Sequence, residues 1–384
     1  MKLFTLIVDR LYAAAYDWRR FNPVLRKDGK FYDTGVRDTK VWLFEAGYDG
    51  SFKELYLFDN AYDPAIGSND PHGEASCEWI DENKTKMVCV GGAHGQYTPM
   101  KYAIVDVEQW SVTKSGDFGS INLTYPIPVK LPNGKIRYFF RRGPDVNEYV
   151  YTDFDPSTET FSDFTSFTTG GSKSVPCILG KDFDTGRYIF GFSAQSYTDL
   201  RIVLFDPSTE KWYDPDGTEL SLPIDVSGSA GYILQQIGDG YMYKKNNRYV
   251  ACRPNSDQTA LICEIRDISF NVVASYQITN VYADGHVAVT IVSVDPLIIV
   301  VFSSDRTKLL LIRVDIEGAT HEIIDEVDLP DVAGGLGGMT LDDPLTFIGH
   351  TKLGSDPGEY VTHKPLIFKV RYETVLELVV QALR

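Results

Sequence analysis

Short strand-like runs that end in Asp recur along the chain at a nearly constant spacing. Seven copies occur: Leu6-Ile-Val-Asp9, Tyr56-Leu-Phe-Asp59, Ala103-Ile-Val-Asp106, Thr152-Asp-Phe-Asp155, Val203-Leu-Phe-Asp206, Glu264-Ile-Arg-Asp267 and Ile312-Arg-Val-Asp315. The Asp residues are 50, 47, 49, 51, 61 and 48 residues apart, and a further run, Leu366–Val370, lacks the Asp. Such a period, with several short strands in each unit, is typical of propeller blades and not of helical repeats.

Between these runs the chain alternates strand and turn. Apolar stretches such as Lys86-Met-Val-Cys-Val90 are separated by Asn-, Gly- and Asp-rich turns such as Pro132-Asn-Gly134. Two turn segments are nearly identical, Phe154–Glu159 and Phe205–Glu210. In both, Asp can accept backbone hydrogen bonds and Pro presets φ, which predicts a tight turn leading into the outermost strand of a blade. We interpret these segments as scaffold and not as catalytic.

The pattern therefore predicts an all-β protein, a seven-bladed β-propeller with four-stranded antiparallel blades. Seven marker strands end between Asp59 and Val370, which gives seven blades, and eight blades are the alternative. The strand Leu3–Asp9 is left over and would close the ring by joining the last blade. Because no linker or change of composition divides the chain, residues 1–384 are expected to form one domain.

The composition limits the classes of binding partner that are expected. A hydrophobic content of 43% with 13% aromatic residues describes a folded chain, and the formal charge of −16 repels nucleic acids and anionic membranes. No apolar run has the length of a membrane-spanning segment. The apolar start of the chain is interrupted at Asp9 and Arg10, so we expect either no signal peptide or one already removed.

Two pairs of cysteines flank probable hairpin turns. Cys77 and Cys89 form one pair, and Cys252 and Cys263 form the other. Disulfides and free buried thiols fit these spacings equally well.

Two histidines lie at the ends of one predicted hairpin. Its strands fall near 75–80 and 86–91, with the turn centred on Asn83, so residues i and 166 − i face each other. His72 and His94 then oppose one another at the open end, each followed by a glycine that lets a ligand approach. A functional pair and a structural pair of hydrogen-bonded histidines both fit this placement.

A second pair occupies the equivalent place in the next repeat. The Asn133-Gly134 turn puts Tyr125 within one residue of being opposite Arg141. Four polar side chains from two neighbouring blades are thereby expected on one rim, where propellers bind their ligands.

Several stretches resemble one enzyme family. They are Asp70-Pro-His72-Gly-Glu-Ala-Ser, Gly91-Gly-Ala-His94-Gly with Pro99-Met-Lys-Tyr102, Tyr125-Pro126 with Phe139-Phe-Arg141-Arg-Gly143, and Trp212 with Asp216-Gly-Thr and Ser221-Leu-Pro-Ile224. In these residues the chain is similar to the BNR-repeat polysaccharide lyases, which include the ulvan lyases and the rhamnose–glucuronate lyases. The resemblance covers about residues 60–225; the 22 residues between the histidines and the 16 from Tyr125 to Arg141 are close to that family's spacing.

The resemblance implies a propeller that cleaves a uronic-acid glycan by β-elimination. Arg141 would pair with the uronate carboxylate. Tyr125 would be base, acid or both, and a tyrosine pKa near ~10 needs a neighbouring cation for the base role. His72 and His94 would hold the carboxyl group or share the proton transfer, and the division of roles stays open.

Substrate binding is further expected from Arg142, Lys101 and Tyr97, although Arg142 stands where the family has a small residue. Arg137 and Lys130 would complete a local basic pocket on the acidic body. The resemblance allows bound calcium, but no carboxylate cage in the sequence requires it.

A polysaccharide or other glycan is the expected partner, and an extracellular, cell-surface or virion-associated location follows from it. The alternative function is a non-catalytic propeller that binds glycans or serves as a structural protein.

Overall fold

The fold is described from a computed structural model. It covers the following residues: 4–7, 12–13, 25–47, 51–65, 67, 70–143, 148–169, 177–193, 199–226, 233–235, 241–255, 257, 259–283, 289–329, 333–340, 343–352 and 362–369.

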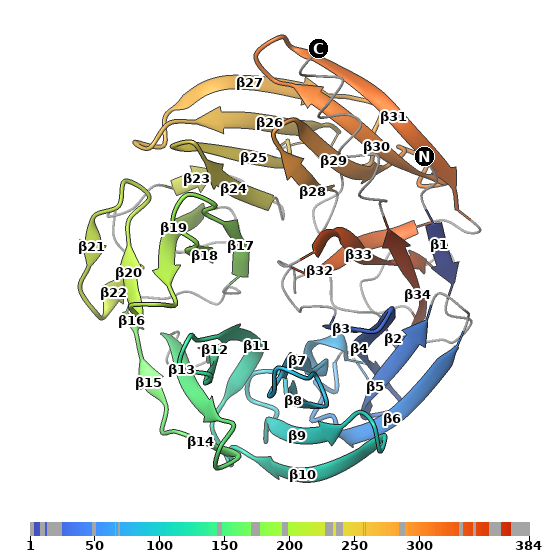
Figure 1. Cartoon of the computed structure of the whole chain (residues 1–384), viewed down its shortest axis with the longest axis vertical. Coiled ribbons are helices and arrows are strands. Elements are labelled where there is room, and N and C mark those ends of the chain that lie inside the picture. The colour runs from blue at the N-terminus through green and yellow to red at the C-terminus, as the bar shows by residue number, and fades with distance from the viewer. Residues whose placement is uncertain are drawn as a thin grey trace.

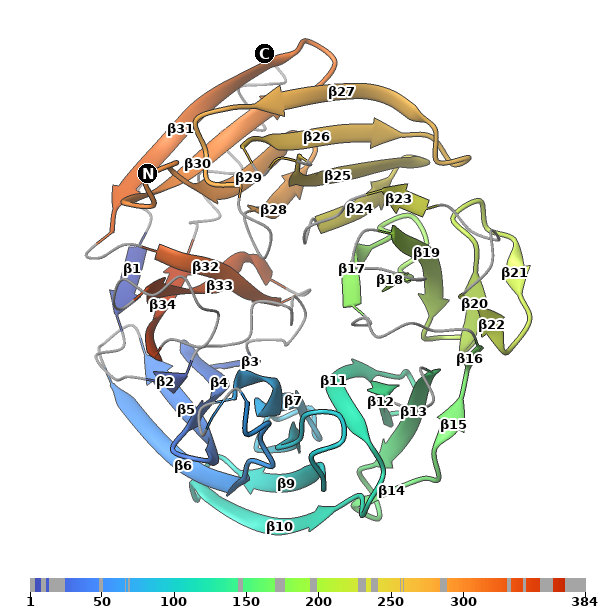
Figure 2. The ribbon, with the colours of Figure 1, turned by 180° about the vertical axis from the view of Figure 1, so that it is seen from behind.

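These residues form an all-β structure whose sheets follow one another around a common centre (Figure 1). Figure 2 shows the same ring from behind. The only helical element among the described residues is a short 3-10 turn, η1 (Pro71–Gly73). No described helix has the length and apolarity needed to cross a membrane.

Most sheets are antiparallel units of about four strands in chain order. Three such sheets consist of four strands each: β7 (Ser76–Trp79), β8 (Lys86–Gly91), β9 (Lys101–Asp106) and β10 (Ser111–Asp117); β24 (Tyr241–Lys245), β25 (Arg248–Pro254), β26 (Leu261–Arg266) and β27 (Val272–Ile278); and β28 (Val289–Val294), β29 (Leu297–Phe302), β30 (Lys308–Asp315) and β31 (Thr320–Asp328).

Two sheets have additional short strands. The first contains β11 (Leu123–Lys130), β12 (Ile136–Arg142), β13 (Glu148–Asp155), β14 (Thr160–Phe161) and β15 (Thr165–Ser166). The second contains β17 (Cys177–Lys181), β18 (Tyr188–Ser193), β19 (Asp199–Asp206), β20 (Lys211–Tyr213), β21 (Glu219–Leu220) and β23 (Ile233–Gln235). Between them, β16 (Thr168–Thr169) and β22 (Ile224–Asp225) form a parallel pair.

The N-terminal and C-terminal strands share one sheet. It contains β32 (Ala333–Thr340), β33 (Asp343–Lys352), β34 (Thr362–Lys369), β1 (Phe4–Ile7), β2 (Tyr12–Ala13), β3 (Leu25–Lys27), β4 (Lys30–Arg37), β5 (Lys40–Gly47) and β6 (Phe52–Asp59). Strand β1 pairs antiparallel with β34, and β2 bridges β34 and β4. The prediction that the first strand joins the last repeat is therefore confirmed.

The repeated residues Asp155 and Asp206 have a structural role, as predicted, whereas Asp9 lies outside the described residues. Asp155 and Asp206 end β13 and β19, and each accepts the backbone N–H of the serine two residues later as the chain turns into the next, outer strand. The period is nevertheless out of step at Asp59, which ends the edge strand β6, whereas Asp106 ends the third strand of its sheet. The long connection that contains η1 lies between β6 and β7. Its length keeps the interval from Asp59 to Asp106 close to the repeat period, although the two Asp residues end different strands of their sheets.

The same turns join neighbouring sheets through ion pairs. In each case an acidic residue at the turn contacts a basic residue of the preceding sheet: Glu108 with Lys27, Glu159 with Lys86, Glu210 with Arg137 and Glu317 with Arg248.

Buried aromatic residues fill the space between sheets. Trp212 packs against Phe167 with ring centroids 5.0 Å apart and against Phe139 at 5.7 Å. The stretch around Trp212 thus contributes to the core.

Candidate functional site

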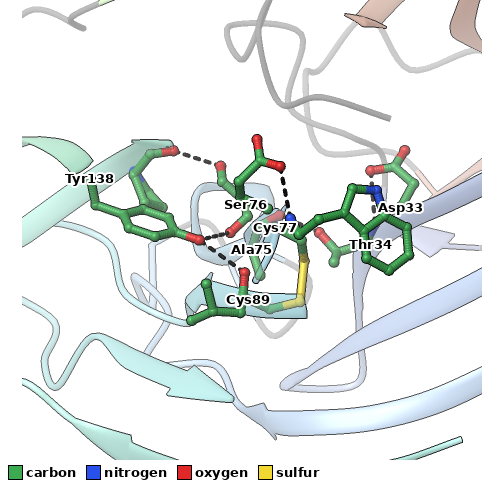
Figure 3. Close-up of a disulfide and its surroundings, with 11 residues drawn as sticks. Asp33, Thr34, Ala75, Ser76, Cys77, Cys89 and Tyr138 are labelled. Carbon is green, nitrogen blue, oxygen red and sulfur yellow. Dashed lines mark hydrogen bonds between the residues drawn. A yellow bond between two sulfur atoms is a disulfide. The ribbon is translucent and has the colours of Figure 1, made fainter. Parts of the chain in front are cut away.

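The hairpin β7–β8 has the predicted register. Cys77 lies opposite Cys89, so residues whose numbers add to 166 face each other. The two cysteines form a disulfide with Cα atoms 4.1 Å apart (Figure 3), and Cys252–Cys263 is a second disulfide of the same kind. The free-thiol alternative is wrong for both pairs.

Side chains from both neighbouring sheets fasten this hairpin. Thr34 Oγ1 on β4 donates to the carbonyl of Ala75, and Tyr138 Oη on β12 donates to the carbonyl of Val88 at 2.9 Å. Figure 3 shows these groups around the disulfide. The open end of the hairpin is therefore held in place relative to β11 and β12, which carry Tyr125 and Arg141.

His72 is placed by a capped turn. Asp70 precedes η1 and accepts the backbone N–H of His72 at 3.0 Å, and Pro71 suits the first helical position because it has no N–H to satisfy. Gly73 then accepts a hydrogen bond from the N–H of Gly92, which ties this turn to the end of β8.

His94 reaches the same place from the other strand of the hairpin. The imidazole rings of His72 and His94 are stacked, with centroids 3.6 Å apart and an interplanar angle of 4°. The following residue, Gly95, has a φ of 58° and donates its N–H to Thr124 Oγ1. The two histidines therefore face each other as the register predicted.

Asp70 is the member of the site that sequence reasoning missed. Its buried carboxylate accepts hydrogen bonds from Nδ1 of His72 at 2.5 Å and from Nδ1 of His94 at 2.9 Å. Burial opposes ionisation, but these hydrogen bonds and the histidine charges outweigh it and hold the pKa of Asp70 well below its ordinary value. One feature of the sequence could have indicated this role: Asp70 stands two residues before His72 in a turn, and an Asp at this spacing commonly accepts a hydrogen bond from the backbone.

Tyr125 sits in an irregularity of β11. The pairing with β12 shifts between Thr124 and Ile127, and Tyr125 has a φ of 59°, a left-handed conformation that costs a non-glycine residue about 1 kcal/mol or more. Bulges of this kind redirect a side chain and concentrate at functional sites.

The bulge brings Tyr125 to the histidines and to Arg141. Thr124 lies opposite Arg141, so Tyr125 is within one residue of it, as predicted. The guanidinium carbon of Arg141 lies 4.9 Å from the Tyr125 ring centroid, and the rings of Tyr125 and His72 are 5.8 Å apart. Cation, phenol and imidazoles thus converge, and Tyr125 itself is buried.

The three residues expected to bind substrate have different environments. Tyr97 exchanges backbone hydrogen bonds with His94 and lies beside the site. Lys101 Nζ donates to the carbonyl of Asp59, and the Arg142 guanidinium forms an ion pair with Glu148 at 2.8 Å.

The expected basic pocket does not include Arg137. Its buried guanidinium pairs with Asp153 at 2.8 Å and Glu210 at 2.6 Å. Lys130 is exposed at the turn end of its hairpin, paired with Ile136. The pattern of charges along β11 and β12 could not separate the two ends of the strands, where these residues have different neighbours.

One group of side chains among the described residues could hold a metal ion. Asp70, His72 and His94 have ligand atoms within 4.8 Å of one another. A calcium ion prefers six to eight oxygen ligands, and this group offers one carboxylate, so calcium does not fit it. The carboxylate is also engaged by hydrogen bonds from both imidazoles.

A separate cavity of about 700 Å³ lies between the sheets of β24–β27 and β28–β31. Apolar side chains such as Val250 and Leu297 line it together with two ion pairs, Arg248 with Glu317 and Arg313 with Glu322. It shares no residue with the His–Tyr–Arg group.

The comparisons with known proteins identify a fold. No family model and no curated protein matches the chain. A solved PL25 ulvan lyase matches with a TM-score of 0.69 at 13% identity, covering 94% of this chain and 95% of the lyase. The polysaccharide lyase Uly1 matches with a TM-score of 0.60 at 12% identity, covering 94% of this chain and 92% of Uly1.

The fold is shared with these polysaccharide lyases. A further structure, a PL25 ulvan lyase bound to GlcA(1-4)Rha3S, has a TM-score of 0.63 at 13% identity and covers 92% of this chain and 95% of that one. The likeness extends over most of the chain, beyond the stretch around residues 60–225 in which the sequence resembles the lyases. At these identities it establishes the architecture and not the reaction.

Proposed function

We propose that this protein is a polysaccharide lyase that cleaves a uronic-acid-containing glycan by β-elimination. The observation that carries the proposal is the convergence of Tyr125 with Arg141 and the stacked pair of His72 and His94. A phenol beside a cation, with imidazoles next to it, supplies the charge stabilisation and the proton transfers that this reaction needs.

The reaction breaks the C5–H and C4–O4 bonds of the uronate and forms a C4–C5 double bond. Arg141 neutralises the carboxylate, which makes the C5 proton acidic. Tyr125 or a histidine accepts that proton, the C5–H electrons form the double bond, and the O4 leaving group takes a proton from the same set of side chains. No water is consumed.

Tyr125 is the preferred residue for contact with the reacting sugar. Its ring contacts both Arg141 and His72. A φ in the left-handed region, maintained by the bulge, supports a functional role because such strain accumulates at sites that need a fixed side chain.

We further propose that the architecture is a single seven-bladed propeller. Support comes from the succession of four-stranded units and from the pairing of β1 with β34, which joins the two ends of the chain in one unit. The two disulfides favour an oxidising, extracellular setting, which suits an enzyme that acts on polymers.

The proposed substrate class is a glucuronate-containing anionic glycan. One solved lyase of this fold has GlcA(1-4)Rha3S bound. The formal charge of −16 opposes anionic polymers at long range, and Arg141 provides the local positive charge that binding requires.

The test is incubation with ulvan, gum arabic and related glycans while the ultraviolet absorbance of the unsaturated uronate is recorded. The expected result is an increase with at least one glycan, and its loss in Tyr125→Phe while glycan binding is retained. Glycan binding with no absorbance change across the panel would instead support the non-catalytic alternative.

A further inference from the structure

The carboxylate of Asp70 has four donors around it. Oδ1 accepts from the Nδ1 and the backbone N–H of His72, and Oδ2 accepts from Nδ1 of His94 and the backbone N–H of Asp63. An ionised carboxylate is an acceptor only and offers about four lone-pair sites, so these four donors fill it.

This arrangement specifies where the imidazole protons are. Because ionised Asp70 cannot donate, Nδ1 of His72 and Nδ1 of His94 must each carry a hydrogen. A neutral histidine with a protonated Nδ1 has its lone pair on Nε2. In its neutral form each ring therefore accepts a proton at Nε2, and the two stacked rings are nearly parallel.

We propose that Asp70 is a positioning residue that holds His72 and His94 in the same tautomer, so that proton acceptance at the site occurs at a pair of Nε2 atoms. The consequence for catalysis rests on the function proposed above: a proton that passes between the sugar and an imidazole does so at Nε2. Asp70 itself contacts the histidines and acts through them.

The burial of the group explains why one carboxylate serves two rings. Asp70 is fully buried and the side chain of His72 is 5% exposed, so water cannot readily replace the carboxylate as the acceptor for His72. A buried donor left without an acceptor costs about 1–3 kcal/mol. Removal of the charge should therefore make an imidazole change its tautomer rather than leave its Nδ1–H unpaired.

The experiment is long-range ¹H–¹⁵N NMR of the histidine rings in the folded protein, with His72→Gln and His94→Gln used for assignment. We expect both rings to have a protonated Nδ1. In Asp70→Asn, at least one ring should move its proton to Nε2, because the amide nitrogen donates and only the amide oxygen accepts.

The matched control is Asp81→Asn. Asp81 lies at the turn end of the same hairpin and accepts hydrogen bonds from Thr85 and Lys86, so its replacement perturbs the hairpin without touching the histidines. Asp81→Asn should leave both tautomers unchanged. With an active glycan, Asp70→Asn should lower kcat about 100-fold with KM within a few-fold, and Asp81→Asn should not.

An Nδ1 without a proton on either ring of the unmodified protein, or unchanged tautomers in Asp70→Asn, would overturn the proposal. The NMR result does not depend on turnover. If the unmodified protein shows the expected tautomers but cleaves no glycan, the proposed function fails and the positioning role of Asp70 stands.

Discussion

The backbone N–H of Gly95 donates to the side-chain oxygen of Thr124 across 2.5 Å. Gly95 follows His94 in the connection between β8 and β9, and Thr124 precedes Tyr125 in β11 of the next sheet, so this contact couples the two halves of the candidate site. Thr124 is fully buried.

Replacement of Thr124 by Val should uncouple these halves. The Gly95 N–H would lose its acceptor in a buried place, which we expect to lower the free energy of unfolding by about 1–3 kcal/mol. Thr124→Ser retains the hydroxyl and should stay close to the unmodified protein in chemical denaturation. Equal stability of Thr124→Val and Thr124→Ser would show that the hydrogen bond contributes nothing.

Both disulfides should stabilise the fold, but only one should affect the candidate site. The disulfides close loops between cysteines 12 and 11 residues apart, and replacing either cysteine pair by alanine should cost about 2–3 kcal/mol in chemical denaturation. Only Cys77→Ala with Cys89→Ala should also disturb the His72–His94 pair, because that disulfide lies in the hairpin that carries both rings. Loss of glycan cleavage in the Cys252→Ala, Cys263→Ala variant at matched folded fraction would contradict this difference.

The ion pairs at the turns should stabilise the contact between sheets unequally. Glu210→Gln should cost about 0.5–1 kcal/mol, because the glutamate is partly exposed and screened by solvent. Asp153→Asn should cost more, about 2 kcal/mol, since Asp153 holds Arg137 with two hydrogen bonds and the guanidinium is buried. Denaturation midpoints for the two variants test the order, and a larger loss in Glu210→Gln would contradict it.

Asp70 should make stability depend on pH in the acid range. Its folded pKa is depressed, so the stability it contributes is complete above the ordinary carboxyl pKa of about 3.9 and is lost as the pH falls below that value. The difference in unfolding free energy between the unmodified protein and Asp70→Asn should therefore shrink on acidification through this range. A difference that stays constant from neutral pH to below the ordinary carboxyl pKa would show that Asp70 is not ionised in the native state.

The sequence predicted the parts of this molecule that follow from local pattern. Turn residues determined the register of β7–β8, so the positions of Cys77, Cys89, His72 and His94 could be worked out from the turn centre alone. The spacing of the Asp runs likewise indicated antiparallel repeats and the pairing of the first strand with the last.

Other features depend on tertiary contacts that pattern does not encode. The bulge that rotates Tyr125 arises from the register shift against β12, and Arg137 finds its partners on β13 and on a turn of the next sheet. The role of Asp70 could not be predicted for a different reason. An Asp before Pro indicates a turn, and the hydrogen bond to a second histidine requires His94, which is 24 residues further along the chain.

The central claim, cleavage by elimination, is tested most directly by digestion of a glucuronate glycan in water labelled with heavy oxygen, followed by mass spectrometry of the products. Elimination consumes no water, so we predict fragments with an unsaturated uronate end and no heavy oxygen incorporated by the cleavage. Incorporation of one labelled oxygen for each bond cleaved, or an intact polymer with every glucuronate glycan tested, would contradict the account.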